Sequence, residues 1–120
     1  MMKKAQALNT FWNGFGLIAY DDSTVPDDAK LPYITFSQSD DDFGFPISLT
    51  ASLWYRGKRW DAISDKLEEI SNHITRGGVM VAYDGGAMLV RKGNPFAQRM
   101  KDEDDSIRRI VMNVEVEYLT

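Results

Sequence analysis

The chain has 120 residues, of which 18 are acidic, 14 are basic and none is cysteine, and its net charge is −4. This length suits one hydrophobic core, so we predict a single domain over residues 1–120. The lack of cysteine excludes disulfides, thiolate metal sites and thiol nucleophiles, and it is typical of a reducing compartment. The acidic balance and the scattered basic residues argue against specific nucleic-acid binding.

Nothing in the sequence indicates export or membrane insertion. Lys3 and Lys4 stand near the start, but no apolar run follows them, so we expect no signal peptide. The chain also lacks a run of about 18 apolar residues, the length that crosses a bilayer. We therefore expect a cytoplasmic protein without membrane contacts.

The first part of the chain predicts a helix and then a loop. A short amphipathic helix is expected over residues 3–15, and an exposed loop over residues 21–30, which are rich in aspartate and contain Pro26. The helix prediction rests on apolar residues at helical spacing, namely Ala5, Leu8, Trp12 and Phe15.

Two strands follow, joined by an acidic turn over residues 40–46. The first strand is predicted over residues 33–37. The second, over residues 47–55, alternates cleanly between apolar and polar positions, as a half-buried antiparallel strand does. Trp54 falls on the face opposite Leu49 and Leu53.

The second half of the chain predicts one helix and three strands. The helix covers roughly residues 60–75, and its apolar stripe is Trp60, Ile63, Leu67, Ile70 and Ile74. The two short strands 79–83 and 87–91 are joined by Asp84-Gly85-Gly86, a strong hairpin signal. A polar linker from Lys92 to Ser106 then leads to a long strand over residues 107–119. We therefore predict an α+β fold: a mostly antiparallel sheet of about five strands, with two helices packed on one face.

The sequence shows no recognisable catalytic or metal site. His73 is the only histidine, and we expect it to be exposed near a helix end. The cluster at Asp40 resembles half of a calcium loop, but the downstream glutamate is missing. Asp102 to Asp105 lack the required glycine and spacing. We expect no enzyme activity, no cofactor and no tightly bound metal.

Some large side chains are not explained by the predicted core. Trp54 faces away from it, and three phenylalanines lie in predicted loops. Such residues mark protein contacts or pack as a satellite core under a long loop, and the sequence leaves both alternatives open. With the acidic clusters around them, the candidate contact residues are Asp40, Asp41, Asp42, Phe43, Phe45, Trp54, Phe96, Asp102, Asp104 and Asp105.

Several segments in this order resemble the tail terminator and tail completion (tail-to-head joining) proteins of long-tailed bacteriophages. The resemblance covers most of the chain, although no single residue is diagnostic of the family. The segments are Phe15-Gly16-Leu17-Ile18-Ala19-Tyr20, Val25-Pro26, Leu31-Pro32-Tyr33-Ile34-Thr35-Phe36, Ser52-Leu53-Trp54-Tyr55, the helix from Trp60 to Ile74, Asn94-Pro95-Phe96-Ala97-Gln98, and Ile107-Arg108-Arg109-Ile110-Val111-Met112-Asn113.

The resemblance implies a non-enzymatic virion assembly protein without a cofactor. Such a phage or prophage protein forms a ring, typically a homohexamer, that caps the tail tube and joins it to the head–tail connector. It is assembled in the cytoplasm of the bacterial host and ends in the virion. Two alternatives stay open: a neck or head-completion protein of the same virion, and a small host adaptor that binds another protein.

Overall fold

The computed structural model describes residues 2–39 and 46–119, so the predicted acidic turn lies almost wholly outside the described residues. The chain begins with a continuous helical segment, which confirms the first predicted helix. It ends at Gly16, whose φ of 81° is a left-handed conformation that favours glycine. The segment consists of the 3-10 helix η1 (Lys4–Gln6), α1 (Ala7–Trp12) and the 3-10 helix η2 (Asn13–Phe15).

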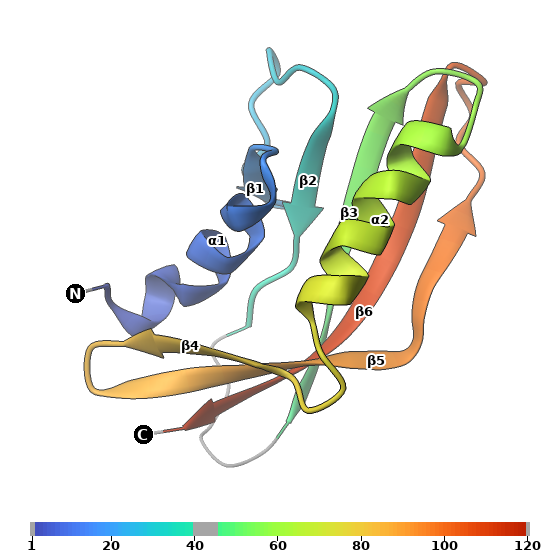
Figure 1. The fold of residues 1–120 in the computed structure, drawn as a ribbon. Coiled ribbons are helices and arrows are strands. Elements are labelled where there is room, and N and C mark those ends of the chain that lie inside the picture. The colour runs from blue at the N-terminus through green and yellow to red at the C-terminus, as the bar shows by residue number, and fades with distance from the viewer. Residues whose placement is uncertain (1, 40–45, 120) are drawn as a thin grey trace.

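A curled, mostly antiparallel sheet forms the rest of the framework (Figure 1). In the described ranges it has six strands, in the order β1-β2-β3-β6-β5-β4, and only β1 and β2 run parallel. The α+β class and the antiparallel character are as predicted. The strands are β1 (Ala19–Asp21), β2 (Tyr33–Phe36), β3 (Ile47–Arg56), β4 (Val79–Tyr83), β5 (Gly86–Met100) and β6 (Ile107–Leu119).

The prediction of about five strands missed β1. This strand has three residues, too few to show an alternating pattern in the sequence. It forms because Ala19 pairs with Ile34 of β2, a partner that comes after a loop in the chain. Tertiary pairing therefore decides the conformation of these residues.

The prediction of a polar linker from Lys92 to Ser106 is wrong for residues 92–100, because these residues belong to β5. Pairing with β6 is maintained up to Lys92 and resumes at Ala97, with a register shift between them. Gly93 fits there because a Cβ at this position would lie 2.9 Å from the Cβ of Asn113. The Nδ2 of Asn113 donates to the carbonyl of Pro95 at 2.9 Å. The Gly-Asn-Pro sequence is therefore a bulge inside a strand.

The second predicted helix is present as α2 (Asp61–His73), which contacts β3 and β6. Ile63, Ile70 and Ile74 of its predicted stripe are fully buried, and Trp60 and Leu67 pack partly buried against the same core. The core also holds Leu49 and Leu53 of β3, as predicted.

Helix α1 contacts β1 and β4, which are the two edge strands of the sheet. The curl of the sheet thus brings its two edges to the same short helix (Figure 1). Within the described residues, no helix is both long enough and apolar enough to cross a membrane.

Candidate interaction surface

The described residues contain no cluster of three or more His, Asp or Glu side chains placed to hold a metal ion. His73 lies exposed in the last turn of α2, as predicted. Its ring packs edge-on against Phe15, with the ring centroids 5.3 Å apart.

A row of large side chains crosses the sheet on the face opposite the core, and we call it the outer stripe. It consists of Tyr20, Tyr33, Trp54, Arg109 and Met100. Tyr33 pairs with Trp54, Trp54 with Arg109, and Arg109 with Met100 across neighbouring strands. Tyr20 extends the row onto β1, because its ring meets Tyr33 edge-on at 5.7 Å.

Trp54 is half-buried on this face, opposite the buried Leu49 and Leu53, as the alternation in β3 predicted. Its Nε1 donates to Thr35 Oγ1 at 2.9 Å, and the Cζ of Arg109 lies 4.4 Å from its ring centroid. The indole is thus bonded on one side and covered by a cation on another.

A pocket of about 270 Å³ lies beside Trp54. The hydroxyl-bearing residues Thr35, Thr50 and Ser52 line it together with Arg109 and Asp22. The pocket offers hydroxyl groups and an aromatic ring, so it is suited to a polar side chain with an apolar stem.

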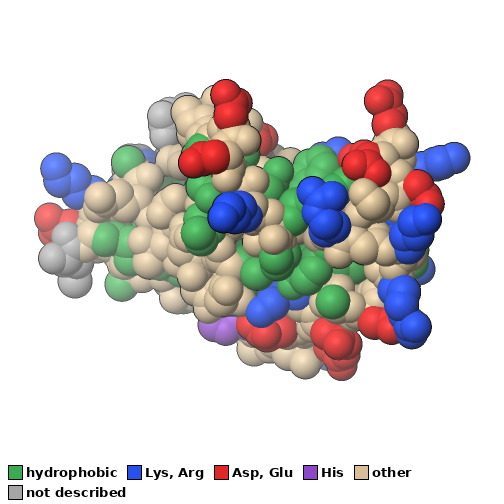
Figure 2. Space-filling view, turned by 90° about the horizontal axis from the view of Figure 1, so that it is seen from above, with side chains coloured by type: hydrophobic (Ala, Val, Ile, Leu, Met, Phe, Trp, Pro, Cys, Tyr) green, Lys and Arg blue, Asp and Glu red, His purple; other side chains and the backbone are tan. Residues whose placement is uncertain are grey.

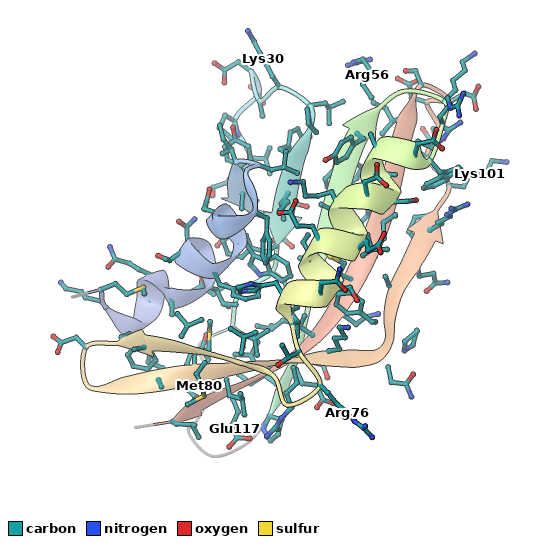
Figure 3. All side chains as sticks on the ribbon, viewed as in Figure 1. Lys30, Arg56, Arg76, Met80, Lys101 and Glu117 are labelled. Atoms are coloured by element: carbon teal, nitrogen blue, oxygen red, sulfur yellow. The ribbon has the colours of Figure 1, made fainter. Side chains whose placement is uncertain are left out.

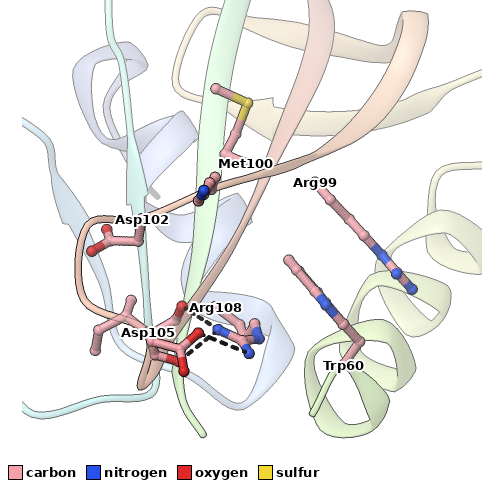
Figure 4. A pocket seen from close by; sticks show the side chains of 8 residues that line it. Trp60, Arg99, Met100, Asp102, Asp105 and Arg108 are labelled. Atoms are coloured by element: carbon pink, nitrogen blue, oxygen red, sulfur yellow. Dashed lines mark hydrogen bonds and ion pairs between the residues drawn. The ribbon is translucent and has the colours of Figure 1, made fainter. Parts of the chain in front are cut away.

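A second pocket, of about 390 Å³, lies where α2 begins and the hairpin of β5 and β6 turns (Figure 4). Trp60 lines this pocket and has the guanidinium of Arg99 over its ring at 4.5 Å and that of Arg108 at 5.4 Å. Arg108 donates to the carbonyls of Lys58 and Asp105 at 2.7 and 2.8 Å. Arg108 therefore ties the turn after β3 to the turn after β5.

The predicted acidic contact residues of this turn are engaged within the turn. Asp102 Oδ1 accepts the backbone N–H of Asp104 at 2.9 Å, and hydrogen bonds from the hydroxyl and N–H of Ser106 lower the pKa of Asp104. Asp105 pairs with Lys58 at 3.6 Å and with Arg108 at 3.8 Å. Asp102 and Asp105 also line the pocket around Trp60. In the described structure the three aspartates order the turn.

Phe96 does not lie in a loop, as the sequence analysis expected, because it belongs to the bulged part of β5. It packs half-buried against the core, with Lys92 Nζ 5.3 Å from its ring centroid. A role for the exposed part of Phe96 in a protein contact stays a prediction. The remaining candidates, Asp40, Asp41, Asp42, Phe43 and Phe45, lie outside the described residues.

The pocket around Trp60 lies at the end of the molecule where β3 and β5 finish and β6 begins. Figure 2 looks onto this end and shows hydrophobic side chains gathered beside Lys and Arg, with acidic side chains projecting around them. Arg56 and Lys101 project at this end, whereas Met80 of β4 lies far from it (Figure 3). Among the described residues, the large hydrophobic side chains that are exposed are Ile18, Met80 and Met100.

Trp54 was predicted from the sequence as a candidate contact residue, whereas its neighbours in the outer stripe were not. Tyr33 and Arg109 are separated from Trp54 by 21 and 55 positions in the chain, and only strand pairing brings them together. The available signal was the alternation of β6, which places Arg109 on the face opposite Ile110. Without the register, that signal does not say which residue lies beside it.

No protein-family model matches the chain, and comparisons with curated proteins and with solved structures give no match either.

Proposed function

We propose that the protein is a non-enzymatic phage or prophage assembly subunit, which forms a ring that ends the tail tube and joins it to the head–tail connector. The family resemblance in the sequence gives the specific role. The observation that carries the proposal is the outer stripe, a row of aromatic, arginine and methionine side chains on the face of the sheet opposite the core. These residue types are enriched in protein interfaces.

The proposal includes both helices packing on the inner face of the sheet, so that the outer face stays free for a neighbouring subunit. A closed ring repeats one heterologous contact, so each subunit needs two different patches. The outer stripe serves as one patch. Exposed acidic segments of the chain, including the loop between β1 and β2, serve as the other.

The β1 edge of the sheet favours contact through side chains over contact by strand addition. At β1, the side chain of Asn13 accepts a hydrogen bond from the Ala19 N–H and donates one to the Ala19 carbonyl. The Thr24 N–H donates to the carbonyl of Asp21. An edge blocked in this way cannot accept a strand from a neighbour along its length. We therefore place the ring contact on the outer face.

The test is the size and shape of the purified assembly. Sedimentation across a concentration series, followed by negative-stain electron microscopy, is expected to show a concentration-dependent ring with a central opening. A two-fold dimer, or a monomer up to the limit of solubility that also fails to bind isolated tail tubes, would contradict the proposal. A stable monomer that binds one partner would support the adaptor alternative instead.

A further inference from the structure

The guanidinium of Arg109 is held in a fixed orientation. It covers the ring of Trp54 at 4.4 Å, and its Nε donates to Ser52 Oγ at 3.2 Å. Ser52 is itself buried, and Trp54 is anchored to Thr35. Because the orientation is set before any ligand arrives, Arg109 loses little conformational freedom on binding one.

The two Nη atoms of Arg109 form no hydrogen bond or ion pair with residues 2–39 or 46–119. Asp22, the acidic residue lining the same pocket, makes no ion pair with Arg109 in this part of the chain. Arg108 differs, since main-chain carbonyls and Asp105 already occupy its guanidinium. Arg109 is therefore oriented by the protein and has two donor groups left over.

We propose that the pocket beside Arg109 receives the carboxylate of an Asp or Glu side chain from a second copy of this chain. The two Nη atoms bind the carboxylate, and the apolar stem of the incoming side chain packs on Trp54 and Tyr33. A guanidinium matches a carboxylate in a planar, bidentate arrangement, so this contact sets both the position and the angle of the neighbour. The inference rests on the proposed function and names one of its contacts.

The charge of the chain favours a second copy as the occupant. The chain has 18 acidic and 14 basic residues, so identical copies offer each other more carboxylates than cations. Asp27, Asp28 and Glu103 are exposed and make no ion pair or side-chain hydrogen bond within the described ranges. A nucleic acid would instead meet a chain whose net charge is −4.

The first arm of the test measures self-association by sedimentation for the wild-type chain and for Arg109→Gln. We expect Arg109→Gln to weaken self-association by at least about tenfold, because a central arginine contact is a common hot spot. Arg109→Lys keeps the positive charge but lacks the two Nη donors of the guanidinium. The strength of its self-association is expected to lie between those of the wild type and Arg109→Gln. Arg76→Gln is the matched control, since Arg76 is exposed after α2 and lines neither pocket, and this change is expected to leave self-association unchanged.

The second arm titrates the peptide acetyl-Asp-Glu-Asp-amide, which repeats residues 102–104, into the chain. Binding is followed by the indole N–H signal of Trp54, assigned with Trp54→Phe. A saturable shift that disappears in Arg109→Gln supports the carboxylate site. Inorganic phosphate or an oligonucleotide binding more tightly than the peptide would overturn the choice of carboxylate.

The two arms separate the two proposals. If Arg109→Gln melts like the wild type and self-associates as tightly, the proposed carboxylate contact is wrong. The ring proposal is not affected by that result. If the wild-type chain never self-associates, a second copy is ruled out as the occupant, and the ring is ruled out as well if the chain also fails to bind isolated tail tubes. Arg109-dependent peptide binding in that case still supports a carboxylate site, with a different protein as its source.

Discussion

The side chain of Asn13 bonds both backbone groups of Ala19: its Oδ1 accepts the Ala19 N–H at 2.9 Å, and its Nδ2 donates to the Ala19 carbonyl at 3.3 Å. A side-chain amide carries one acceptor and one donor group, so it takes the place that a neighbouring strand would occupy. The end of the first helical segment thereby closes the free edge of β1.

This relationship predicts that Asn13→Ala lowers the free energy of unfolding by about 1–2 kcal/mol, because two backbone groups of a buried residue lose their partner. Urea denaturation followed by circular dichroism measures the change. Asn72→Ala is the control, since Asn72 is exposed on α2, and its change is expected to stay within about 0.5 kcal/mol. Equal effects of the two substitutions would show that the edge closure contributes nothing to stability.

The bulge in β5 predicts a cost for a methyl group at Gly93. A Cβ there would lie 2.9 Å from both the Cβ and the carbonyl oxygen of Asn113, closer than real contacts allow. Gly93→Ala is expected to lower the free energy of unfolding by about 1–3 kcal/mol through overpacking. The readout is the midpoint of chemical denaturation.

Gly77→Ala serves as the matched control, because nothing lies within 4 Å of a Cβ at that position. It is expected to leave stability unchanged or slightly raised, since alanine restricts the unfolded chain. A Gly93→Ala variant as stable as Gly77→Ala would mean that β5 does not approach β6 as described.

The surroundings of Tyr55 lead us to predict that the folded chain loses stability at alkaline pH. Burial raises its pKa above 10.0, and the negative charges of Glu69 and Asp65 raise it further. The folded chain therefore holds the phenol proton more tightly than the unfolded chain does. The resulting stabilisation is present below pH 10.0 and is lost as the pH rises above that value through the folded-state pKa.

Tyr55→Phe has no phenol to ionise, so its stability is expected to fall less steeply above pH 10.0 than that of the wild type. Denaturation midpoints measured in steps across the alkaline range give the two slopes. Removing the nearby charge with Glu69→Gln is expected to move the wild-type slope toward that of Tyr55→Phe. Parallel curves for all three chains would assign the alkaline loss to other groups.

The local periodicity of the sequence was enough to predict α2, β3 and β6. In α2 and the residue that caps it, the spacing of Ile63, Ile70 and Ile74 marks a buried stripe, and in β3 the alternation separates Trp54 from Leu53. These features follow from the chain itself, because burial on one side of a helix or strand repeats with the geometry of that element.

Tertiary structure alone decided the features that depend on a distant partner. β1 exists through pairing with β2, and Asn113 accommodates a bulge whose glycine and proline otherwise indicate a linker. The outer stripe likewise needs the register that sets Arg109 beside Trp54. Local sequence reports which side chains share a face of a strand. It does not report which strand becomes the neighbour, because pairing energy comes from residues far apart in the chain.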